Sequence, residues 1–301
     1  MSPLRAGGTG GAALPPLVPP FTSACTWRLR ERLGPAWSTA ASPGVGVGDL
    51  VLQACLNGVR PADAHPGLPV SPDQLARDAA AVAALGVRSV HVHPRCAQSL
   101  ETIDPDRVGE VIAAIRSVAP AIEVVVPSAR WVAPDPRRRV DAVHRWARLG
   151  PGARPDVVAV NVGEDGWQRV CAAACAVGIG LELGVWTPAD AVLLRQGRLP
   201  AGVIRVVAEV TVGDPIIAVA EADRILRALG PVTVPVLVHG EDAGAWAVWA
   251  HAIALGLHTR VGLEDMLTGP DGGPTHGNAD LVEHALRIQP LPPPPRQQAH
   301  R

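Results

Sequence analysis

Two histidines stand two positions apart in the apolar segment RSVHVHPR, at positions 91 and 93. Alternate residues of a β-strand point to the same side, so both imidazoles can reach one cation. A distant segment, TRVGLED, ends in Glu264 and Asp265. Burying Glu264 without a partner would cost several kcal/mol. We therefore predict that His91, His93 and Glu264 bind one divalent metal ion, the alternative being that the histidines are hydrogen-bonded core residues.

The ligand set also indicates the kind of metal site. Two histidines and one carboxylate leave coordination positions open, as catalytic zinc sites do. The same ligands suit Mn²⁺ and non-haem Fe²⁺, so zinc is the favoured choice among three. The chain contains no lysine, which excludes a lysine Schiff base and a lysine-bound pyridoxal cofactor. A carbonyl substrate must then be polarised by a metal, by arginine or by backbone donors.

Arg260 and Asp265 flank the expected third ligand. Arg260 lies four residues before Glu264, and an even separation places both on one face if the strand stays regular. An Arg–Asp couple beside a Lewis acid suits proton abstraction next to a carbonyl, with the arginine anchoring a substrate carboxylate. A salt bridge that locks the seam of the fold fits the same spacing equally well.

These residues belong to a regular alternation of apolar strands and helical patterns. Helical patterns such as SPDQLARDAAAVAALG follow the strands, and several begin with Ser or Asp and end at Gly. Apolar strands separated by helices indicate a parallel sheet that is covered on both faces. The eight strands are expected at residues 49–57, 87–94, 122–128, 157–163, 180–186, 203–211, 234–240 and 259–265.

Eight such units in about 240 residues fit a closed (β/α)₈ TIM barrel. A doubly wound open sheet is the alternative, but the segment LNGVRPADAHPG after the first strand lacks the phosphate-binding glycine pattern. We expect the barrel to form one catalytic domain over residues 48–288. Residues 1–47 are rich in Gly, Pro and Ala and are expected to be a flexible leader, and residues 289–301 a Pro-rich tail.

The amino-acid composition limits the classes of binding partner that the protein is expected to have. The formal net charge is −1, so neither a nucleic-acid groove nor a membrane-surface patch is implied. No apolar run reaches the ~18 residues that a membrane helix needs. The N-terminus lacks the pattern of a signal peptide, and the five cysteines lack paired spacing. We expect a cytoplasmic protein that acts on a small molecule.

In a TIM barrel the chemistry lies at the carboxyl ends of the strands. Polar residues in the last positions of the apolar segments are therefore further candidates. Glu182 on the fifth strand is a candidate catalytic residue. The predicted substrate-binding residues are Asn57, Arg95, Ser128, Asn161 and Glu209.

The segments HVHPR, HGEDAGAW and TRVGLEDMLTGPDGGPTHGNADLVEHA, together with the helical pattern above, resemble the β-keto acid cleavage enzyme family over residues 49–288. The resemblance implies a zinc-dependent (β/α)₈ barrel, usually a tetramer. It also implies an acyltransferase that condenses a β-keto acid with acetyl-CoA. A retro-Claisen cleavage then yields acetoacetate and a new acyl-CoA.

Carried over by residue, the resemblance assigns His91, His93 and Glu264 to the metal and Arg260 and Asp265 to proton transfer, and it matches Glu182 to a family glutamate. The chain departs from the family pattern at four positions, where a loop acid, a strand-end serine, a glutamate and a hydroxyl residue are replaced by Cys96, Pro127, Arg60 and Ala159.

Two other functions are open. An amidohydrolase-type metal hydrolase also uses an H-x-H pair on a barrel, but that class has the pair on its first strand and histidines on strands five and six. Those strands carry Glu182 and Glu209 here. The second alternative is a barrel that keeps its metal but is catalytically impaired, because the residues around the substrate differ.

Overall fold

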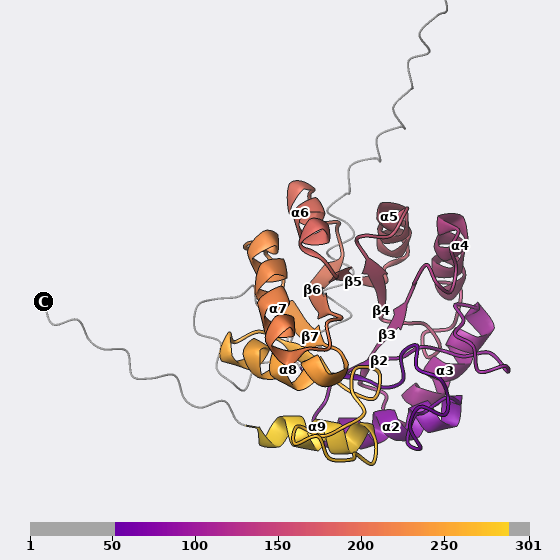
Figure 1. Cartoon of the computed structure of the whole chain (residues 1–301). Coiled ribbons are helices and arrows are strands. Elements are labelled where there is room, and N and C mark those ends of the chain that lie inside the picture. The colour runs from indigo at the N-terminus through magenta and orange to yellow at the C-terminus, as the bar shows by residue number, and fades with distance from the viewer. Residues whose placement is uncertain (1–51, 289–301) are drawn as a thin grey trace, which may run out of the picture.

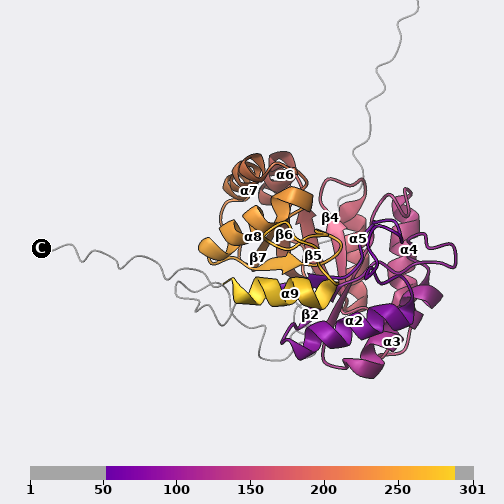
Figure 2. The same cartoon turned by 60° about the horizontal axis from the view of Figure 1, so that its bottom comes forward.

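The computed structural model describes residues 52–288, which form a parallel eight-stranded barrel surrounded by helices (Figures 1 and 2). The expected leader and tail lie outside the described residues. The strands are β1 (Leu52–Cys55), β2 (Ser89–His91), β3 (Glu123–Pro127), β4 (Val157–Asn161), β5 (Gly180–Val185), β6 (Val203–Val210), β7 (Val236–Gly240) and β8 (Thr259–Val261).

Neighbouring strands follow the chain, in the order β7-β6-β5-β4-β3-β2-β1-β8. The last gap is closed between β7 and β8, where the Val238 amide donates to the His258 carbonyl at 2.9 Å and the His258 amide donates to the Val236 carbonyl at 3.1 Å. The predicted (β/α)₈ barrel is confirmed. Within residues 52–288, no helix has both the length and the apolar character needed to span a membrane.

The helices are α2 (Pro72–Ala84), α3 (Pro105–Val118), α4 (Pro136–Trp146), α5 (Trp167–Val177), α6 (Pro188–Gln196), α7 (Pro215–Leu229), α8 (Ala245–Ala254) and α9 (Asn278–Arg287). Five of these begin with a capping side chain followed by proline, namely at Ser71, Asp104, Asp135, Thr187 and Asp214. Each cap satisfies backbone amides of the first turn, and proline presets its dihedral angle. These helix starts follow the carboxyl ends of the strands, so the caps fix the loops that carry the candidate site.

Side chains alternate along each strand between the barrel interior and the layer that packs against the helices. In β5, Leu181, Leu183 and Val185 are buried in the apolar layer between sheet and helices, whereas Glu182 points into the barrel. There Arg205 donates to the carboxylates of both Glu182 and Glu123. The opposite charges of this buried cluster compensate one another, and the cluster forms the floor beneath the candidate site.

Candidate metal centre and surrounding cavity

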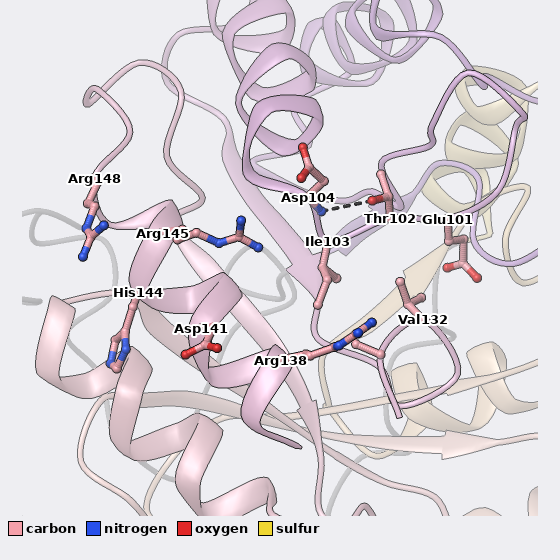
Figure 3. A pocket seen from close by; sticks show the side chains of 11 residues that line it. Glu101, Thr102, Ile103, Asp104, Val132, Arg138, Asp141, His144, Arg145 and Arg148 are labelled. Carbon is pink, nitrogen blue, oxygen red and sulfur yellow. Dashed lines mark hydrogen bonds between the residues drawn. The ribbon is translucent and has the colours of Figure 1, made fainter. Parts of the chain in front are cut away.

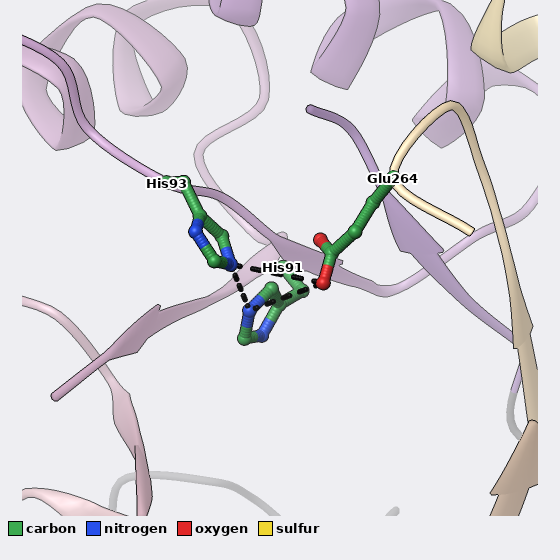
Figure 4. Close-up of side chains that lie close together, drawn as sticks. All are labelled: His91, His93 and Glu264. Carbon is green, nitrogen blue, oxygen red and sulfur yellow. Dashed lines mark hydrogen bonds and ion pairs between the residues drawn. The ribbon is translucent and has the colours of Figure 1, made fainter. Parts of the chain in front are cut away.

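His91, His93 and Glu264 meet at the carboxyl end of the barrel (Figure 4). The Nε2 atoms of the two histidines lie 2.9 Å apart. Oε1 of Glu264 lies 3.9 Å from Nε2 of His91 and 3.7 Å from Nε2 of His93. Glu264 lies 171 residues after His93 in the sequence, yet the three side-chain atoms form one small triangle.

The size of this triangle fits a metal ion. A circle through the three atoms has a radius of about 2.1 Å, which is the usual distance from zinc to nitrogen and oxygen ligands. Oε2 of Glu264 and Nδ1 of His91 are buried without a hydrogen-bond partner in the described part of the chain. Burial lowers the pKa of His91 well below its usual value, which favours the neutral imidazole that metals bind. The residues present therefore fit a mononuclear divalent metal.

Glu264 reaches this point from a turn, not from a regular strand. β8 ends at Val261, four residues before the expected strand end. A side chain on Gly262 would place its Cβ 2.0 Å from the Cys55 carbonyl oxygen, and one on Gly58 would lie 2.3 Å from Cγ of Glu264. Two glycines therefore let the 262–265 turn pack against β1 and leave space for the Glu264 side chain.

His93 is held by Asn57 and Glu101. The Asn57 amide group donates to the His93 carbonyl and accepts from its backbone amide, both at 2.9 Å. Glu101 accepts a hydrogen bond from Nδ1 of His93 through one oxygen and from Nε1 of Trp131, at 3.0 Å, through the other. A carboxylate on the far nitrogen of a ligating histidine fixes its tautomer and its orientation. Glu101 was not predicted, because it lies in a loop eight residues beyond His93, where spacing gives no signal.

We expect Glu101→Ala to weaken zinc affinity by about 10–100-fold, the usual cost of removing such a supporting carboxylate. Glu101→Gln should lose less, because an amide oxygen still accepts from the imidazole. Competition titration with a zinc chelator measures both values. Glu110→Ala, which removes an exposed glutamate on α3, is the matched control. Equal affinity in Glu101→Ala and wild type would contradict the supporting role.

Arg260 bridges Glu264 and Asp265. Its guanidinium donates to Oε1 of Glu264 at 2.9 Å and to both carboxylate oxygens of Asp265 at 3.1 and 2.8 Å. Burial alone would raise the pKa of Asp265, but Arg260 and His239 hold it well below its usual range. Burial and the charge of Arg260 would lower the pKa of His239. The carboxylates of Asp265 and Glu209 outweigh them and raise this pKa to about 9. Asp265 is thus a buried carboxylate paired with Arg260.

A cavity of about 270 Å³ opens beside the metal centre. The predicted residues that line it are His91, His93, Asn161, Glu182, Glu209, Arg260 and Glu264. The other four contact protein instead. Asp265 lies behind Arg260, Asn57 bonds the His93 backbone, Arg95 donates to the carbonyls of Gly58 and Arg60, and Ser128 donates to the Ala159 carbonyl.

Glu241 is a further lining residue, placed directly after β7. Burial, together with the negative charges of Glu209 and Asp265, raises the pKa of its carboxyl group to about 7. A base that titrates near neutral pH is suited to take a proton from a substrate. The sequence places Glu241 after a strand but shows no partner for it, because Glu209 approaches from β6 only in the folded chain.

A larger cleft, of about 710 Å³, lies beside the cavity and is bordered by Glu101 and by one face of α4 (Figure 3). Arg138, Arg145 and Arg148 line it. Within the described residues none of these three guanidiniums has a hydrogen bond or ion pair. Of the facing carboxylates, Glu101 is bound to His93, and Asp104 caps α3. Asp141 is the third carboxylate in the lining.

The fold and the site together define a (β/α)₈-barrel protein with a candidate mononuclear metal centre at the carboxyl ends of its strands. The family model of the beta-keto acid cleavage enzymes matches residues 49–290. The chain belongs to this family, and the family resemblance inferred from the sequence is confirmed. A search of curated proteins found no match.

Solved structures share the fold at low identity. The apo structure of ObcA is 17% identical, with a TM-score of 0.56 over 74% of this chain and 61% of that chain. The ternary complex of ObcA with a C4-CoA adduct and oxalate gives a TM-score of 0.55, 17% identity and coverage of 74% and 63%. 3-Dehydroquinate dehydratase from Geobacillus kaustophilus HTA426 is 12% identical, with a TM-score of 0.56 over 79% of this chain and 90% of that chain. The chain thus spans less than two thirds of the ObcA chains that it matches.

Proposed function

We propose that the protein is a zinc-dependent β-keto acid cleavage enzyme that uses acetyl-CoA. The reaction converts R–CO–CH₂–COO⁻ and acetyl-CoA into acetoacetate and R–CO–CoA. The observation that carries the proposal is the His91–His93–Glu264 triangle at the edge of a cavity, in a chain that belongs to this family. ObcA, which is similar in fold, has been solved with oxaloacetate, itself a β-keto acid.

When bound, the metal would supply Lewis acidity toward the keto and carboxylate oxygens of the substrate. The chain supplies the remaining groups. Arg260 presents a cation at the cavity for a substrate carboxylate, and Asp265 positions Arg260 from behind. Asn161 and Glu209 are proposed to contact the substrate. Asn57, Arg95 and Ser128, which bond backbone atoms, are proposed to hold the binding loops in place.

Glu182 is proposed to act through the metal ligands. Its Oε1 lies 3.9 Å from Nδ1 of His91, and its Oε2 accepts from Gln53 at 3.1 Å and from Arg205. Burial alone would raise the pKa of the Glu182 carboxyl group, but Arg205 and His91 lower it. Glu182 therefore stays charged and faces the far side of the His91 ring.

Glu241 is the proposed base that removes a proton from the carbon next to the keto group. The base must be ionised, and its pKa is about 7, so kcat/KM should fall about tenfold for each pH unit below that value. Glu241→Gln should lower kcat by about 10²–10⁴-fold and should remove this acidic limb. A pH–rate profile of both proteins is the measurement. A variant that keeps the wild-type limb would assign it to another group.

The cleft beside α4 is proposed to bind the phosphates of acetyl-CoA. The 270 Å³ cavity is too small for a whole coenzyme A molecule, whereas the adjoining cleft offers three arginines that have no partner within residues 52–288. Guanidinium groups recognise phosphates well. We expect Arg145→Glu to raise the KM for acetyl-CoA by about tenfold or more with kcat unchanged. Arg198→Glu, an exposed control, should leave KM unchanged, and equal values for both variants would place the coenzyme elsewhere.

The direct test incubates zinc-loaded protein with acetyl-CoA and a panel of β-keto acids. Release of acetoacetate with formation of a new acyl-CoA supports the proposal. Stoichiometric metal without turnover supports the impaired-scaffold alternative, and hydrolysis of amide or lactone substrates supports the amidohydrolase alternative. From the resemblance we also propose that the protein is a cytoplasmic homotetramer. Light scattering after size exclusion tests the tetrameric state.

A further inference from the structure

The cavity beside the metal centre has two halves of different chemistry. Charged and metal-binding groups come from β2, β6, β8 and the loops that follow β1, β2, β7 and β8, as with His93, Glu209 and Arg260. The opposite half is built by the consecutive strands β3, β4 and β5 and the loops after them. The residues that line that half above Glu182 are Pro127, Ala129, Trp131, Ala159, Asn161, Gly184 and Trp186, and none of them carries a charge.

Two tryptophans form the outer part of this uncharged half, which we call the apolar wall. The rings of Trp131 and Trp186 are 5.9 Å apart between centroids and tilted by 43°, an ordinary geometry for a packed aromatic pair. The indole N–H of Trp131 is used by Glu101. The nitrogen of Trp186 is buried and has no hydrogen-bond partner in the described chain.

The charged side chains beside the apolar wall are paired with other protein groups. Glu209, on the neighbouring strand β6, lies with Oε2 3.5 Å from Nε2 of His239. Arg60 also lines the cavity, but its guanidinium donates to Asp242 at 2.6 Å and to the Glu264 carbonyl at 2.9 Å. The Glu182 carboxylate is bound by Arg205 and Gln53 toward the barrel floor. A charged ligand group against the wall would therefore be desolvated without a counter-charge, which is costly.

We propose that the apolar wall binds the R group of the β-keto acid and selects an uncharged, predominantly apolar R group. The inference rests on the proposed function. The carboxylate and keto oxygens of the substrate belong on the half that carries the metal ligands and Arg260, so the R group faces β3–β5. Ala159 and Pro127 lie in this wall and offer no hydrogen-bonding side chain.

Binding to zinc-loaded protein without acetyl-CoA tests the proposal, because no turnover can then occur. Isothermal titration should give Kd values that tighten about fourfold for each CH₂ group from 3-oxobutanoate to 3-oxohexanoate. The 6-amino derivative of 3-oxohexanoate and the dianion 3-oxohexanedioate should bind at least about tenfold more weakly than 3-oxohexanoate. Equal or tighter binding of either charged analogue, or no binding of the whole series, would overturn the proposal.

Variants locate the effect. Ala159→Asp should weaken 3-oxohexanoate and strengthen its 6-amino derivative, thereby reversing the preference. Trp131 is 43% exposed, so Trp131→Ala provides a second variant that is expected to fold. Trp131→Ala should flatten the dependence of Kd on the length of the R group. Trp131→Phe should keep most of this dependence, and the control Trp246→Ala, on α8, should keep all of it. An unchanged chain-length dependence in Trp131→Ala would contradict the wall.

The two proposals can fail separately. Tight binding of apolar keto acids without acetoacetate formation once acetyl-CoA is added would refute the proposed function and leave the apolar wall standing. Turnover that is fastest with a charged R group would support the cleavage activity and refute the wall.

Discussion

His91→Ala should abolish stoichiometric zinc binding. The variant removes one corner of a triangle in which Nε2 of His91 lies 2.9 Å from Nε2 of His93 and 3.9 Å from Oε1 of Glu264. Two remaining protein ligands hold a zinc ion far less tightly than three, and we expect a loss of affinity of about 10³-fold. The measurement is zinc content after dialysis together with a chelator competition titration.

The matched control for this loss is His276→Ala. His276 is an exposed histidine whose side chain takes no part in the metal centre. It should retain one equivalent of zinc, as should wild type. Full metal occupancy in His91→Ala, with a wild-type dissociation constant, would remove His91 from the ligand set.

Asp265→Asn should keep the metal and lower kcat by about 10²-fold or more, the cost of losing a buried group that orients a charge in an active site. Asp265 does not reach the cavity but accepts two hydrogen bonds from Arg260 at 3.1 and 2.8 Å. Asparagine removes the negative charge that orients Arg260. Steady-state rates and zinc content measured on the same preparation separate catalysis from metal loss.

Asp271→Asn is the control for that charge change, because Asp271 lies in an exposed loop. Its rate should equal that of wild type. If Asp265→Asn also turned over at the wild-type rate, Asp265 would have no part in the reaction and its pair with Arg260 would be a salt bridge of the barrel seam.

The sequence predicted the barrel and the shared orientation of the two histidines because both depend on simple periodicity. Eight apolar segments followed by capped helices specify the topology, and the two-residue spacing of His91 and His93 places both on one face. Glu264 lies beside the two histidines for a reason other than its position in a regular strand. β8 stops at Val261, and a turn permitted by Gly58 and Gly262 brings the carboxylate back to the histidines.

The parts that the sequence did not predict depend on contacts between loops. Glu101 supports His93 from a loop after β2, and Trp131 and Trp186 meet from the loops after β3 and β5. Loops have no regular repeat, so the spacing of residues in the sequence does not predict which loop side chains come into contact. Likewise, the position of Asp265 behind Arg260 follows from the turn after β8, which an assumed regular strand does not contain.

The central claim is tested most directly by locating the metal. A crystal structure of the zinc-loaded protein, with anomalous scattering at the zinc edge, should place one ion at about 2.0–2.2 Å from Nε2 of His91, Nε2 of His93 and Oε1 of Glu264. An ion bound elsewhere, or these three side chains bound only to protein atoms under saturating zinc, would contradict the account.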